Sequence, residues 1–106
     1  MATRFIVVLT TLPTRAKARR MATLVLKEKM AACVNLVGPA ESFFWWQGKV
    51  DQAKEYLLLI KTRTSHFVRI QKFLEKHHPY SVPEIVALPI QKGNTSYLSW
   101  LEESVR

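Results

Sequence analysis

The chain has 106 residues, of which 48% are hydrophobic, 10% are aromatic and only three are glycine, a composition that excludes a disordered protein and predicts a single folded domain over residues 1–106. No apolar run approaches the roughly 20 residues that span a bilayer, so we expect a soluble protein and no membrane partner. The formal net charge is +8, and residues 1–30 hold seven basic side chains and one acidic side chain, a net charge of +6.

Apolar runs and turn residues predict four strands and three helices. In chain order these are a strand over Phe5–Leu9, a helix after Thr14, a strand over Ala31–Val37 resuming at Ser42–Gln47, a strand over Val50–Thr62, a helix from Ser65 to His77, a strand over Glu84–Leu88 and a helix capped by Asn94 or Thr95. We expect Thr14 and Ser65 to cap their helices and Pro39 to interrupt the second strand. The order β-α-β-β-α-β-α predicts an α+β, ferredoxin-like sandwich with a C-terminal helix.

The second and third strands form a hairpin around the turn residues 47–49, and this hairpin is long for so small a chain. We expect it to project beyond the domain and to bind a protein partner, most simply another copy of the chain. Trp45 and Trp46 are adjacent, so on a strand their rings face opposite sides, and we expect one ring in the core and one at the surface or in an interface.

The first helix carries most of the excess positive charge. Its apolar stripe is Ala18, Met21, Ala22 and Val25, and its basic first turn opposes the helix dipole. Such a face suits nucleic acid, an anionic membrane surface or acidic ligands, or serves only to keep the protein soluble.

RNA-recognition domains share the predicted order of elements, so RNA binding has to be weighed. Those domains expose base-stacking aromatic rings on the third strand. Here that strand is aliphatic over Leu57–Ile60, and the basic charge lies on a helix. We therefore do not expect a nucleic-acid partner.

The stretch from His77 to Glu84 combines metal-competent side chains with two rigid prolines. Adjacent helical residues point about 100° apart, so one of His77 and His78 together with Glu84 is the expected metal-binding pair, and two ligands make a weak site unless a second chain adds more. The alternative is structural: one histidine packs on the sheet and the other caps the helix.

Other chemistry is not indicated. The sequence has no glycine-rich phosphate loop and a single cysteine, Cys33, which we expect to be a buried packing residue. No spacing supports a catalytic nucleophile and base, so we do not expect an enzyme. The start of the chain does not fit a secretory signal, and one cysteine suits the reducing cytoplasm.

Six ordered motifs carry a more specific resemblance. They are Ala31-Ala32-Cys33-Val34-Asn35, Trp45-Trp46-Gln47-Gly48-Lys49, Leu59-Ile60-Lys61-Thr62, His77-His78-Pro79-Tyr80, Val82-Pro83-Glu84-Ile85, and Gly93-Asn94 with Tyr97-Leu98-Ser99-Trp100-Leu101. Together they closely resemble the CutA divalent-cation-tolerance family, in register over nearly the whole chain.

The resemblance implies a cytoplasmic, PII-like homotrimer whose long hairpins pair between subunits. It also implies tolerance to copper and other divalent cations, a bound divalent metal ion such as copper at His77, His78 and Glu84, and no catalysed reaction. Some animal members are linked to the anchoring of acetylcholinesterase, so a further protein partner stays open. Where some bacterial relatives have a cysteine near the end of the first strand, this chain has Thr10, and a hydroxyl is a poor copper ligand compared with a thiolate.

Two hypotheses follow. The first is a trimeric metal-binding or metal-response protein. The second is a PII-like effector-binding or protein-interaction module, in which Lys61, Trp46, Tyr80 and Trp100 line a cleft for an anionic or small organic ligand.

Overall fold

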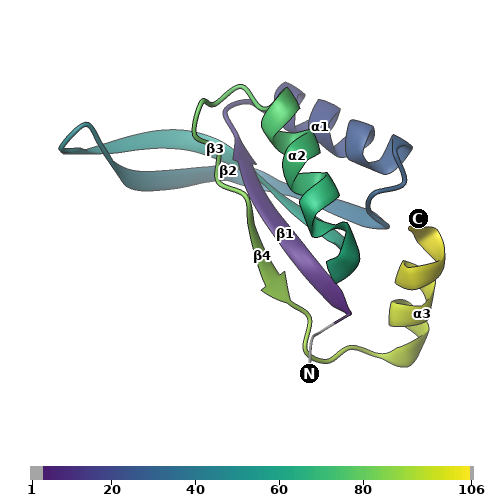
Figure 1. Ribbon diagram of the computed structural model, residues 1–106. Coiled ribbons are helices and arrows are strands. Elements are labelled where there is room, and N and C mark those ends of the chain that lie inside the picture. The colour runs from purple at the N-terminus through teal and green to yellow at the C-terminus, as the bar shows by residue number, and fades with distance from the viewer. Residues whose placement is uncertain (1–3, 106) are drawn as a thin grey trace.

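The computed structural model describes residues 4–105, which form one four-stranded sheet and three α-helices (Figure 1). The elements are β1 (Phe5–Leu12), α1 (Arg15–Lys27), β2 (Cys33–Trp46), β3 (Lys49–Arg63), a short 3-10 turn (Thr64–His66), α2 (Phe67–His77), β4 (Val86–Pro89) and α3 (Thr95–Ser104). The strand order in the sheet is β2-β3-β1-β4, and all pairs are antiparallel. The predicted α+β, ferredoxin-like order is confirmed.

β1 is central because it pairs along its length with β3 and over part of its length with β4. Its register runs from Phe5 opposite Arg63 to Leu12 opposite Tyr56 on one side, and from Ile6 opposite Pro89 on the other. α1 and α2 cover one face of this sheet (Figure 1). Between helices and sheet lies the core, which is made of Ile6, Val8, Leu12, Ala18, Met21, Val25, Met30, Ala31, Leu58, Ile60, Ile70 and Leu74.

The helix boundaries confirm one predicted cap and correct another. Thr14 has extended backbone angles, and its hydroxyl accepts a hydrogen bond from the backbone N–H of Lys17 at 3.1 Å, as expected for an N-cap. Ser65 does not cap α2, because it lies inside the 3-10 turn and the cap position falls on His66. The 3-10 turn tightens the chain as it leaves β3, so α2 begins later than predicted.

β2 and β3 continue past the sheet as a long hairpin that projects from the domain (Figure 1). Gln47 and Gly48 form its turn with φ of +51° and +78°, the two left-handed positions that suit a tight hairpin. As predicted, Pro39 interrupts the pairing of β2, whose register with β3 shifts between Val37 and Ala40. The strand nevertheless continues to Trp46, because a proline is tolerated at a bulge in an edge strand.

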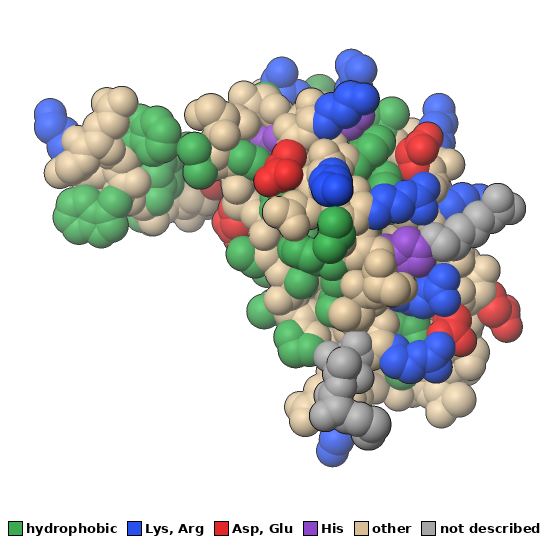
Figure 2. Space-filling model, in the orientation of Figure 1, with side chains coloured by type: hydrophobic (Ala, Val, Ile, Leu, Met, Phe, Trp, Pro, Cys, Tyr) green, Lys and Arg blue, Asp and Glu red, His purple; other side chains and the backbone are tan. Residues whose placement is uncertain are grey.

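The projecting hairpin exposes an aromatic surface, visible as hydrophobic side chains on the arm in Figure 2. Trp45 is 74% exposed and Trp46 is 50% exposed, so the expectation that one of the two rings joins the core is wrong for this chain alone. Both lie beyond the reach of the helices that cover the sheet. Cys33 is likewise half-buried instead of fully buried, because it starts the same edge strand.

The fourth strand is shorter and later than predicted, since only residues 86–89 pair with β1. Within residues 4–105, no helix is both long enough and apolar enough to cross a membrane.

Candidate functional site

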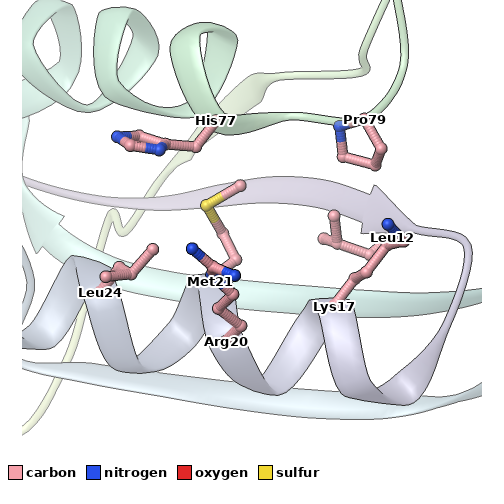
Figure 3. A pocket seen from close by; sticks show the side chains of 7 residues that line it. All are labelled: Leu12, Lys17, Arg20, Met21, Leu24, His77 and Pro79. Carbon is pink, nitrogen blue, oxygen red and sulfur yellow. The ribbon is translucent and has the colours of Figure 1, made fainter.

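α2 ends at His77, and His78 is its C-cap; the two side chains lie in different surroundings. His77 is exposed, and its ring lies against Phe73 with ring centroids 4.4 Å apart. It lines a cavity of about 340 Å3 between α1 and the end of α2 (Figure 3). His78 follows the helix as its C-cap with extended backbone angles (φ −78°, ψ 138°), so the two imidazoles lie in separate surroundings.

His78 lies half-buried against the sheet with both ring nitrogens in hydrogen-bond contact. Its Nδ1 accepts from the backbone N–H of Tyr80 at 3.2 Å, so the neutral ring carries its proton on Nε2, which lies 3.2 Å from the hydroxyl of Thr10. Burial lowers the pKa of His78 below its ordinary 6.5, although a backbone hydrogen bond at Thr11 and the charge of Glu55 act the other way. His78 is consequently a neutral, oriented group at pH 7.

Tyr80 ties the segment after α2 to β3. Its hydroxyl donates to the carboxylate of Glu55 at 2.8 Å, and Glu55 is only 8% exposed. Burial and this hydrogen bond raise the pKa of Tyr80 to about 12. Thr10, His78, Tyr80 and Glu55 thus form a continuous polar contact across β1, the loop and β3.

Glu84 lies elsewhere. It is exposed and lines a broad groove of about 870 Å3 between the loop and the aromatic arm, where its neighbours include Tyr80, Val82 and Trp46. Within residues 4–105, no group of three or more histidine, cysteine, aspartate or glutamate side chains comes together to hold a metal ion. One chain therefore does not assemble His77, His78 and Glu84 into a chelating site.

The four residues proposed for an organic ligand fall into two pairs. Trp46 and Tyr80 line the same broad groove. Lys61 lies beside α3, with its ammonium 5.8 Å from the ring centroid of Tyr97, and the Tyr97 ring is 5.5 Å from that of Trp100. The sequence-based cleft is thus two separate surfaces in a single chain.

The sequence analysis did not identify Glu55 as part of this site. It considered Thr10 only as the residue that stands where some relatives have a cysteine. A carboxylate beside the apolar run Tyr56–Ile60 is the signal that could have found Glu55. A buried carboxylate needs a donor, and Tyr80 supplies it.

Comparisons with known proteins agree on one family. A family model described as CutA1 divalent ion tolerance protein matches residues 6–104. The chain is 46% identical over 101 residues to the rice protein CutA 1, chloroplastic, and the match covers 95% of this chain and 57% of that relative. It is 44% identical over 104 residues to the divalent-cation tolerance protein CutA of Escherichia coli K12, and this match covers 98% of this chain and 93% of that relative.

Solved structures give the same result. The divalent cation tolerance protein Cut A1 from Thermus thermophilus superposes with a TM-score of 0.93 at 46% identity, covering 96% of this chain and 99% of that one. CutA1 from Oryza sativa gives 0.95 at 45% identity, covering 98% and 95%, and the CutA from Archaeoglobus fulgidus, described as periplasmic, gives 0.93 at 37%, covering 96% and 99%. With sequence and fold in agreement along nearly its whole length, the chain belongs to the CutA1 divalent-ion tolerance family.

Proposed function

We propose that this protein is a cytoplasmic homotrimer that binds copper or another divalent metal ion, takes part in the response to metal ions and catalyses no reaction. The observation that carries the proposal is the family match over residues 6–104, together with relatives named for divalent-cation tolerance. The single half-buried cysteine suits a reducing compartment.

The metal donors in this proposal are His77, His78 and Glu84. His77 and Glu84 are exposed, whereas His78 already contacts Thr10 and Tyr80 with its two ring nitrogens. Because one chain does not bring three donors together within residues 4–105, the remaining ligands must come from a neighbouring subunit. We expect weaker affinity than in relatives with a cysteine near the end of the first strand, since Thr10 offers copper only a hydroxyl.

Assembly into a trimer is supported by the projecting arm. Its aromatic side chains are exposed, and β2 leaves an edge of the sheet unpaired within the described chain. Exposed edges and large apolar patches are features of surfaces that a partner covers. Light scattering at micromolar concentration should give the mass of a trimer, and a monomer mass would refute this part of the proposal.

The metal site is tested by calorimetric titration of metal-free protein with copper(II) and zinc(II). The triple variant His77→Ala, His78→Ala, Glu84→Ala should lose saturable binding. Glu75→Ala, which removes an exposed carboxylate of α2, is the matched control and should bind like the wild type. If the triple variant binds as the wild type does, these three residues are not the ligands.

A second candidate function is PII-like effector binding or protein interaction without a physiological metal. The observation that favours it is the groove of about 870 Å3 lined by Trp46 and Tyr80, a size typical of small-molecule sites. Native mass spectrometry distinguishes the two functions, because an organic ligand retained by metal-free protein supports the second. Saturable metal binding with no retained ligand supports the first.

A further inference from the structure

Apart from His77, the cavity at the end of α2 is lined by basic and apolar residues that the proposed metal site does not use. It is lined by Leu12, Lys17, Arg20, Met21, Leu24, His77 and Pro79. Figure 3 shows α1 on one side, with the end of α2 and Pro79 on the other. Its residues divide into an apolar floor and a basic rim.

The floor is formed where β1 ends and α1 packs on it. Leu12 and Met21 are buried, and Leu24 is half-buried. In Figure 3 the side chain of Met21 points from α1 toward the space beneath His77. Leu24, together with the exposed Pro79 on the opposite side of the cavity, offers an apolar contact to a group that enters from the solvent side.

The rim carries two permanent positive charges from one helix face. Lys17 and Arg20 are three residues apart, and each has a floor residue four positions further along the helix, Met21 and Leu24, so all four share one side of α1. Both basic side chains are exposed, and none of the seven lining residues is acidic. Within residues 4–105, neither basic side chain is paired with a carboxylate.

This arrangement is unfavourable in the free protein. Like charges one turn apart on a helix repel each other, and a cation in the first turn opposes the helix dipole. α1 has no acidic residue in its first turn to offset either effect. An anion beside Lys17 and Arg20 would relieve both, and the position near the N-terminal half of the helix favours negative charge.

We propose that this cavity, which we call the α1 groove, binds a compact organic phosphate. The phosphate lies on Lys17 and Arg20, and the apolar body of the ligand packs on Leu24 and Pro79, next to the nearly buried Met21. The fork of an arginine matches two phosphate oxygens, and a dianion suits two cations. A volume of about 340 Å3 is at the small end of ligand pockets, so the ligand is a small ester and not a nucleic acid.

The test uses metal-free full-length protein with labelled methionine methyl groups. Phenyl phosphate is titrated in, and the NMR signal of the Met21 methyl group reports occupation of the floor. We expect a saturable shift, and binding to phenyl phosphate at least about tenfold tighter than to inorganic phosphate, because only the ester buries an apolar body.

The double variant Lys17→Gln, Arg20→Gln should weaken phenyl phosphate binding at least about tenfold. The double variant Arg19→Gln, Lys27→Gln is the matched control: it removes the same charge from exposed positions of the same helix that do not line the groove. It should change affinity less than about threefold.

Three results would overturn the proposal: a Met21 signal that does not saturate, equal affinity for inorganic phosphate, or equal losses in the two double variants. Because the titration contains no metal and changes no proposed metal ligand, its outcome is independent of the metal-binding function.

Discussion

Replacing Tyr80 with phenylalanine tests whether the loop that carries the histidine and glutamate candidates is held by Glu55. The change removes one hydroxyl, the donor 2.8 Å from a carboxylate that is 8% exposed. A hydrogen bond to a charged, buried acceptor contributes about 1.5–3 kcal/mol. For a domain of this length about 1 kcal/mol corresponds to roughly 4 °C, so Tyr80→Phe should lower the melting temperature by roughly 6–12 °C.

The matched control is Tyr97→Phe, because no hydrogen bond involves the Tyr97 hydroxyl within residues 4–105. Melting curves of both variants are compared with the wild type at one protomer concentration, since assembly makes the melting temperature depend on concentration. In a Glu55→Gln background, Tyr80→Phe should lower the free energy of unfolding by only about 0.5–1.5 kcal/mol, the range for a hydrogen bond to a neutral acceptor. A loss below about 0.5 kcal/mol in the wild-type background, the range of an ordinary surface substitution, would refute the argument.

Burial lowers the pKa of both His66 and His78 below 6.5, so as the pH falls below about 6.5 the unfolded chain takes up these protons first. The free energy of unfolding, measured by urea titration between pH 7.5 and 5, should then decrease by up to about 1.4 kcal/mol per pH unit for each histidine, and stability that does not change over this range would contradict the shifts. Trp46→Ala should make the proposed trimer dissociate at a higher protomer concentration in dilution light scattering, whereas unchanged dissociation would remove Trp46 from the proposed interface. Thr62→Val deletes the buried hydroxyl that donates to the carbonyl of Met30 at 2.6 Å and should cost about 1–3 kcal/mol in denaturant unfolding; a neutral result would mean that water replaces this bond.

The order of elements could be predicted because local signals suffice for it. The β-branched run that starts β1, the Thr14 cap and the turn at Gln47 and Gly48 each act within a few residues. Strand ends were less predictable, because they depend on the partner. β4 begins at Val86, which pairs with Leu9 of β1, and not at Glu84 as the sequence predicted.

The candidate site shows the same division between local and distant information. The sequence proposed His77, His78 and Glu84 as candidates, and helix geometry predicted that the two histidines would not act from one face. It could not predict that His78 contacts Thr10, or that Tyr80 contacts Glu55, because those partners lie on other strands. A glutamate is rarely buried unless it is paired. Without knowledge of the Tyr80 hydroxyl as its donor, the sequence therefore predicts Glu55 at the surface.

The central position of β1 also bears on how the chain is made. β1 is synthesised first, yet one of its neighbours is β4, and Ile6 pairs with Pro89 only after that residue has been added. At about 5–20 residues per second, roughly 4–17 s of translation separate the synthesis of Ile6 from that of Pro89. The hairpin of β2 and β3 can close on its own in microseconds, but the central strand stays without one of its partners for seconds. A nascent chain of this protein therefore leaves one edge of β1 unpaired until its last strand has been synthesised.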